Sequence, residues 1–116
     1  MGWNKYIMET KTVIKDVVCP LARTVEIIGD RWTALILRDL FLQGPRRFQD
    51  FSVSLTDVSP NVLSGRLKKL MQHDILTTKM YSQHPPRFEY ILTEKGTELG
   101  NIMAGMRDWG LKHTTP

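Results

Sequence analysis

The sequence predicts a mainly α-helical fold that carries one small β-hairpin, an α+β arrangement. Most of the chain places apolar residues at the i, i+3, i+4, i+7 spacing of amphipathic helices. After residue 74 the period changes to the alternation typical of short strands, and after residue 93 it becomes helical again. A length of 116 residues suits one domain with a real core.

The composition excludes several classes of protein. No apolar run approaches the roughly 20 residues that span a membrane, and the first 18 residues are too polar for a secretory signal. We therefore expect a cytoplasmic protein with no membrane partner. The formal net charge of +4 only mildly favours a polyanionic partner. The one cysteine and the three histidines show no metal-ligand spacing, so we expect no metal and no other cofactor.

Residues 1–18 are predicted to form an N-terminal arm or helix, although their apolar residues follow no single period. Trp3 and Tyr6 are larger than a solvated tail needs. Such side chains at a chain end pack on the rest of the domain or on a second subunit. We expect this arm to contribute to a dimer contact.

Two helices are expected next. Pro20 suits the first turn of one helix, which ends near Gly29. Asp30 can cap the second helix, over residues 31–42, whose apolar side chains, including Trp32, leave few polar positions. This second helix is predicted to be the central buried one.

A short helix with a basic entrance and a capped helix over residues 59–73 follow, joined by a tight connection at 56–58. The later helix has an apolar stripe on one side and, on the other, cations and short polar side chains with no acid. Such a pair predicts a helix-turn-helix whose second helix enters the DNA major groove, although an ordinary solvated helix face would look similar. The residues assigned to DNA contact here are Arg46, Arg47, Ser59, Asn61, Val62, Ser64, Gly65, Arg66, Lys68 and Lys69.

Two β-prone runs, residues 77–81 and 88–92, predict a hairpin with a long polar tip at 82–87. A hairpin directly after a recognition-type helix is a wing, which makes 19–92 a winged helix-turn-helix. Wing side chains can reach the adjacent minor groove or phosphates, and His84 is alternatively a solvated loop residue. The wing residues assigned to DNA contact are Lys79, Gln83, His84 and Arg87.

The last element is predicted to be one helix over residues 93–113, capped by Thr93. Its apolar stripe is either plain core or a dimer interface. Because the earlier helices already fill the core of so small a domain, we favour a symmetric dimer, which would place two reading helices about 34–36 Å apart. The stripe consists of Leu99, Ile102, Met103, Met106 and Trp109.

Eight short motifs resemble the HxlR-type winged helix-turn-helix regulators, which are relatives of MarR. They span Cys19–Ala22, Gly29–Thr33, Leu37–Leu40, Gly44–Phe48, Ser59–Ser64, Arg66–Leu70, Pro85–Tyr90 and Leu92–Gly96. The resemblance implies a prokaryotic transcription regulator that binds double-stranded operator DNA as a homodimer. Gly65 replaces the long polar side chain common in the reading helix, and Asp74 replaces a glycine common after it.

The resemblance also places Cys19 where redox-sensing members carry a reactive thiol. A helix N-terminus stabilises a thiolate, whereas a lone cysteine is often a small buried hydrophobe. Regulation by an oxidant or a small molecule, for instance in a pocket near Trp32 and the dimer helices, is therefore one alternative, and a protein-interaction module is another. No nucleophile–base pair indicates an enzyme, because the acids, including Asp39 and Asp50, are better explained as caps and surface charges.

Overall fold

The computed structural model describes residues 18–116 and divides the chain into two units, one ending at Asp30 and the other beginning at Arg31. In the first unit, helix α2 spans Pro20–Ile28. Pro20 occupies the first turn and Gly29 forms the C-cap, as predicted. Within residues 18–116, no helix is long and apolar enough to cross a bilayer.

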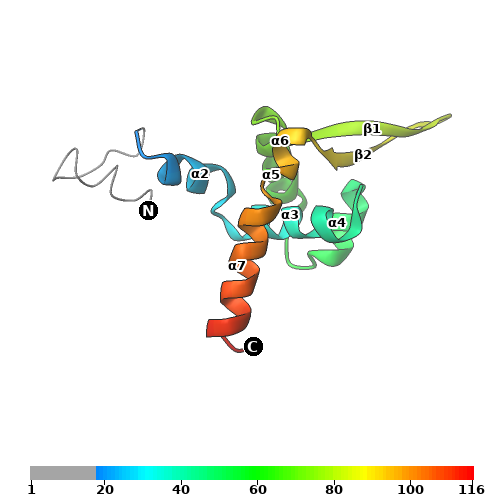
Figure 1. The fold of residues 1–116 in the computed structure, drawn as a ribbon. Helices are drawn as coiled ribbons and strands as arrows, with labels where there is room; N and C mark the ends of the chain where they lie inside the picture. The colour runs from blue at the N-terminus through cyan, green and yellow to red at the C-terminus, as the bar shows by residue number, and fades with distance from the viewer. Residues whose placement is uncertain (1–17) are drawn as a thin grey trace. The chain divides into compact units, whose positions relative to one another are not determined.

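The second unit is a helical bundle with one antiparallel hairpin, as predicted (Figure 1). Its elements are α3 (Arg31–Gln43), α4 (Phe48–Ser54), α5 (Pro60–Gln72), β1 (Leu76–Gln83), β2 (Pro86–Leu92), α6 (Glu94–Thr97) and α7 (Gly100–His113).

The core lies between α3, α4, α5 and the base of the hairpin. Helix α3 is the central one, because its buried residues Thr33, Ile36, Leu37 and Leu40 follow one face. Trp32 is an apolar residue of this helix that is not fully buried. Trp32 lies one position off that face, is half-buried, and carries the Arg31 guanidinium 5.0 Å from its ring centroid.

Asp39 is a buried carboxylate, so its assignment to caps and surface charges was wrong. Arg38 donates from Nε and Nη2 to Asp39 Oδ1, at 3.0 and 2.8 Å, and Ser54 Oγ donates to Asp39 Oδ2. Ser54 is the last residue of α4. A buried carboxylate requires such partners, and here they join α3 to the end of α4.

The hairpin is longer than predicted and its tip is shorter. Gln83 pairs with Pro86, so only His84 and Pro85 connect the strands instead of six residues. Pro86 is tolerated because it is the first residue of its strand. A register shift between Met80 and Ser82 leaves Tyr81 without a paired residue in this described hairpin.

The final helix is broken in two, whereas one helix was predicted. Thr93 caps α6 by accepting from the Gly96 N–H at 3.0 Å. A side chain at Gly96 would lie 2.2 Å from the Ile75 carbonyl oxygen, so this position packs directly on the chain before β1. The Leu99 N–H then donates to the Gly96 carbonyl at 3.0 Å, three residues back, and α7 starts in a new direction.

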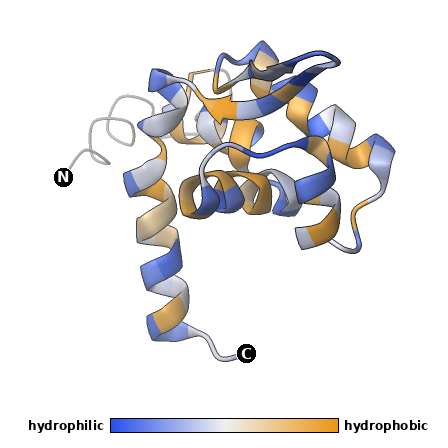
Figure 2. Cartoon of the chain, turned by 90° about the vertical axis from the view of Figure 1, so that its right-hand side faces the viewer, coloured by the Kyte–Doolittle hydropathy of each residue, from blue (hydrophilic) through white to orange (hydrophobic). Residues whose placement is uncertain are grey.

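Helix α7 packs on α3 through its first turn, where Gly100 faces Phe41, and then runs away from the bundle (Figure 1). All of α7 is described, and none of its residues is buried. Figure 2 shows hydrophobic and hydrophilic segments alternating along it. The exposed fractions are 45% for Ile102, 55% for Met106, 63% for Trp109 and 76% for Leu111.

Candidate nucleic-acid interface

Helix α5 has the two faces that its sequence predicts. Ser59 caps it by accepting from the Val62 N–H at 3.2 Å, and Pro60 occupies its first turn. Leu63, Leu67 and Leu70 are fully buried, whereas the opposite side is open to solvent. The exposed residues on that side are Ser59, Asn61, Ser64, Gly65 and Lys68, while Val62, Arg66 and Lys69 lie half-buried beside them.

Two backbone conformations fix where α3 and α5 end. Gly44, after α3, has φ of 79°. Asp74, after α5, has φ of 59°, which confirms that an aspartate serves as the left-handed cap expected there. On the exposed face, the place where a side chain on Gly65 would begin has no atom within 4 Å other than the adjacent residues and the backbone of α5 itself.

The helix pair α4–α5 is closed by a short turn. The Leu55 N–H donates to the Phe51 carbonyl at 2.8 Å, and the Val58 N–H donates to the Leu55 carbonyl at 3.1 Å. Phe51 and Leu55 are buried, so the turn is held from inside as well as by its own hydrogen bonds. This is the helix-turn-helix that the spacing predicts.

Arg46 makes contacts inside the chain. Its backbone bridges to Tyr90 on β2, with N–H to carbonyl distances of 3.0 and 2.6 Å. Its Nη2 donates to the Asp50 carbonyl at 3.2 Å, and the residue is half-buried. The entrance to α4 is therefore attached to the base of the wing.

Arg47 is exposed, but it also has partners. Its backbone N–H donates to Asp50 Oδ2 at 2.8 Å, and its guanidinium forms an ion pair with the same carboxylate at 3.4 Å. The guanidinium also lies 5.9 Å from the ring centroid of Tyr81 on β1. Tyr81, and then Asp50, raise the pKa of Arg47, while the Arg47 N–H lowers the pKa of Asp50.

Tyr81 was not identified from the sequence. It lies far from Arg47 along the chain, and its position in the predicted strand suggested no partner. Strand alternation did not identify it either, because a bulge at this position interrupts the alternation.

The wing residues assigned to DNA contact are all at the surface of the hairpin. Lys79, Gln83, His84 and Arg87 are exposed. Lys79 lies opposite Glu89 in the strand register, so the side of the wing carries an acid as well as a base. The tip is the most accessible part of this element, because it extends from the bundle (Figure 1).

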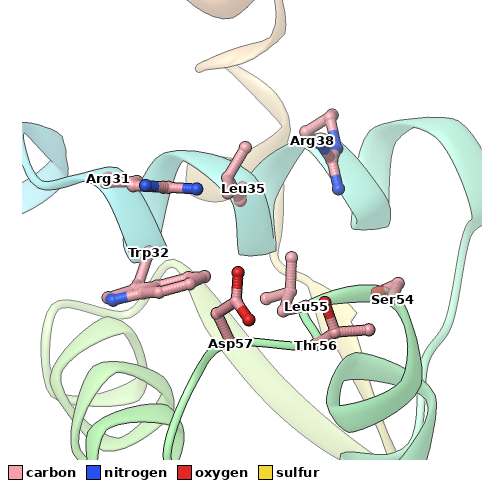
Figure 3. A pocket seen from close by; sticks show the side chains of 8 residues that line it. All are labelled: Arg31, Trp32, Leu35, Arg38, Ser54, Leu55, Thr56 and Asp57. Atoms are coloured by element: carbon pink, nitrogen blue, oxygen red, sulfur yellow. The ribbon is translucent and has the colours of Figure 1, made fainter.

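A pocket of about 200 Å³ lies between α3 and the turn from α4 to α5 (Figure 3). Figure 3 shows the Arg38 guanidinium and the Asp57 carboxylate pointing toward the same space, so the lining carries both charges. No residue of α7 lines it, in contrast to the effector pocket considered near the dimer helices. Its lining residues are Arg31, Trp32, Leu35, Arg38, Ser54, Leu55, Thr56 and Asp57. Within residues 18–116, no group of three His, Cys, Asp or Glu side chains is arranged to hold a metal ion.

The other predicted site residues belong to α2, α7 and the N-terminal residues. Cys19 is half-buried at the N-cap of α2, where its Sγ accepts from the Ala22 N–H at 3.5 Å. In the predicted dimer stripe, Leu99 and Met103 are half-buried, and the other three members are exposed. Trp3 and Tyr6 lie outside the described residues.

Comparison with known proteins agrees with this architecture. Residues 27–116 match the family model described as HxlR-like helix-turn-helix. The chain is 34% identical over 95 residues to the Bacillus subtilis HTH-type transcriptional regulator YdeP, covering 82% of this chain and 73% of YdeP. It is 32% identical over 100 residues to the HTH-type transcriptional regulator YodB of the same organism, covering 85% of this chain and 88% of YodB.

Two solved structures have the same winged helix-turn-helix fold. The redox regulator HypR in its oxidized form superimposes with a TM-score of 0.76 and 30% identity, covering 84% of this chain and all of HypR. The reduced form of YodB superimposes with a TM-score of 0.71 and 32% identity, covering 83% of this chain and 94% of YodB. The chain therefore belongs to the HxlR-like helix-turn-helix family and is a transcriptional regulator with a DNA-binding fold.

Proposed function

We propose that this regulator binds a specific operator duplex as a homodimer, with α5 in the major groove and the wing on flanking DNA. The observation that carries this proposal is the exposed face of α5, which combines cations with short polar side chains and contains no acid. Carboxylates on such a face would repel the phosphate backbone, whereas lysines neutralise phosphates and release their counterions.

The roles of the α5 side chains follow from their chemistry. Asn61, in the first turn, can form a bidentate pair with an adenine edge. Lys68 is exposed two turns later and would contact a phosphate. Ser59 and Ser64 are short donors that fit close to the groove. His84 and Arg87, at the wing tip, would contact flanking phosphates or the minor groove.

The dimer is proposed to form through the apolar side of α7, joined by the N-terminal residues Trp3 and Tyr6. Met106 and Trp109 lie one helical turn apart and are both more than half exposed, which favours a contact with a partner on this side of α7. A two-fold pair of α5 helices would then read successive major grooves. Because its target is chromosomal DNA, we infer that the protein acts in the cytoplasm.

Fluorescence anisotropy tests the DNA proposal. The full chain is titrated against a duplex selected from a random library and against a scrambled duplex, at several salt concentrations. Lys68→Ala should weaken binding to all sequences and flatten the salt dependence, whereas Asn61→Ala should change sequence preference at one position by about 1–3 kcal/mol. Lys112→Ala, in the last turn of α7, is the matched control for loss of one charge. Equal binding by the parent and both α5 variants would remove α5 as the reading helix.

A second candidate function is redox control through Cys19. Its Sγ accepts a backbone N–H at the start of α2, and a structural neighbour is a redox regulator by name. Because the sequence holds one cysteine, a reversible switch requires a disulfide between subunits or a cap from a small thiol. Diamide should release the parent from its duplex but leave Cys19→Ser bound. Identical release in both would remove the role of Cys19.

A further inference from the structure

The start of α4 is joined to the wing by three separate contacts. The Arg46 backbone bridges to Tyr90. The Phe51 ring, which is fully buried, lies 6.2 Å from the Tyr90 ring. The Arg47 guanidinium lies over Tyr81, farther along the wing. Two of these contacts hold the base of the hairpin, and the third reaches its middle.

The surroundings of Arg47 differ from those of a free phosphate-binding arginine. Asp50 Oδ1 forms an ion pair with Arg47 Nη2 at 3.4 Å, and Asp50 Oδ2 accepts a hydrogen bond from the Arg47 backbone N–H. The central carbon of its guanidinium lies over the Tyr81 ring, 5.9 Å from the ring centroid. By contrast, Lys68 on α5 is exposed and makes no side-chain hydrogen bond or ion pair with the described residues.

Tyr81 is the residue that the hairpin irregularity frees from pairing. Residues on either side, Met80 and Ser82, pair with Phe88 and Arg87, and Tyr81 is passed over. A bulge turns a side chain out of the ladder alternation and increases the local twist. Here it directs the ring toward Arg47 at the start of α4.

We propose that Arg47, Asp50 and Tyr81 form a wing clamp that fixes the angle between the hairpin and the α4–α5 pair, so that Arg47 is a positioning residue for DNA binding through Tyr81. This inference rests on the proposed function. It gives Arg47 a role other than the direct DNA contact that its basic side chain suggests.

The clamp makes a distinctive prediction about Tyr81, which carries no charge. If Arg47 binds phosphate directly, Tyr81 is irrelevant to affinity. If Arg47 works through the ring, then removing either partner has the same effect. An exposed cation–π contact predicts a loss of about two- to fivefold in affinity, confined to DNA long enough to meet the wing.

The test uses the full chain and two duplexes, one being the library-selected sequence with its flanks and the other the same sequence trimmed at both ends. The variants are Arg47→Gln, Tyr81→Leu and the double substitution. Arg47→Gln retains the backbone N–H that donates to Asp50 Oδ2 at the start of α4. Phe88→Leu is the matched control, because Phe88 is also an exposed ring on the hairpin and has no cation over its face among the described residues.

The clamp predicts that both single variants lose the same amount of affinity for the long duplex and that the double variant loses no more. The salt dependence of binding should stay unchanged. Phe88→Leu should bind with the affinity of the parent. Loss confined to Arg47→Gln, with the salt slope reduced by about 0.9 per phosphate contact, would overturn the proposal in favour of a direct contact. Parent affinity in both single variants would overturn it as well.

A measurement without DNA separates the clamp from the proposed function. Amide hydrogen exchange in residues 78–82 should become faster by a similar factor in Arg47→Gln and Tyr81→Leu, but not in Phe88→Leu. Unchanged exchange in either clamp variant would refute the clamp. If the parent chain selects no duplex from the library, the proposed function is refuted. The hydrogen-exchange rates would still test the clamp, because they are measured without DNA.

Discussion

Helices α5 and α7 are similar in length and apolar spacing, but they use their stripes differently. The stripe of α5 is buried through Leu63, Leu67 and Leu70. The stripe of α7 remains uncovered, with Met106 and Trp109 more than half exposed. Helical periodicity therefore predicts that the apolar face of a helix packs against something, but not whether that partner belongs to the same chain.

The surroundings of the two helices explain this difference. Helix α5 contacts α3, α4 and β1, so elements before and after it in the chain cover its inner side. Helix α7 contacts α3, with Gly100 facing Phe41, but none of its own residues is buried. Substitutions on the two stripes should therefore report on two separate equilibria, folding for α5 and association for α7.

The largest effect is expected in the α5 stripe. Leu67→Ala removes a fully buried side chain and should lower the free energy of unfolding by about 2–5 kcal/mol. Urea denaturation at low protein concentration measures this. Met71→Ala, at the exposed edge of the same helix, is the control and should cost less. Equal costs would show that the stripe is not the core face.

The second largest effect on stability is expected at the polar contact between α3 and α4. Ser54→Ala removes the donor to Asp39 Oδ2 and leaves a buried carboxylate oxygen without a protein partner, at a cost of about 1–3 kcal/mol. Ser52→Ala, whose hydroxyl only donates to the Phe48 carbonyl on the exposed side of α4, is the matched control. A neutral result for Ser54→Ala in thermal unfolding would mean that water replaces the serine.

A smaller effect is expected at the start of α4. Asp50→Asn weakens the acceptor for the Arg47 N–H and should cost less than about 1 kcal/mol. Because that N–H lowers the pKa of Asp50, the carboxylate stabilises the fold above the ordinary value of about 3.9, and this contribution is lost as the pH falls through the lowered pKa. The stability difference between parent and variant should therefore shrink in acid, and a difference independent of pH would contradict this account.

The smallest effect on folding is expected on α7. Met106→Ala should change the unfolding free energy of dilute protein by no more than about 0.5 kcal/mol, because the side chain is exposed. Met106→Asp should instead shift sedimentation of concentrated protein toward the monomer. Asn101→Asp, exposed at the start of the same helix, controls for the added charge. A large loss of stability in dilute Met106→Ala would mean that α7 folds onto its own chain.

Local signals in the sequence predicted much of the fold. Ser59 with Pro60 marked the start of α5, Asp74 marked its end, and Gly44 followed α3, because each depends on backbone chemistry within a few residues. The α5 face was predictable for the same reason. A capped amphipathic helix divides its residues into two sides whatever packs against it.

The errors came from contacts between distant residues. Asp39 is buried because Ser54, 15 residues away, reaches it. The last helix breaks where Gly96 packs on the Ile75 carbonyl. The pairing of Gln83 with Pro86 shortened the wing tip, and the approach of Tyr81 to Arg47 needs both the bulge and the fold. None of these is encoded in a local pattern.

The open space around Gly65 has an evolutionary consequence. A Cβ there would project from the exposed face of α5 without a close contact to another part of the described chain, and replacing a helical glycine with alanine typically adds about 0.5–1 kcal/mol of stability. Selection for folding therefore does not oppose change at this position. On the proposed function, one substitution here would give a duplicated copy of this regulator a new operator preference, and a library restricted to position 65 would sample those preferences with the scaffold intact.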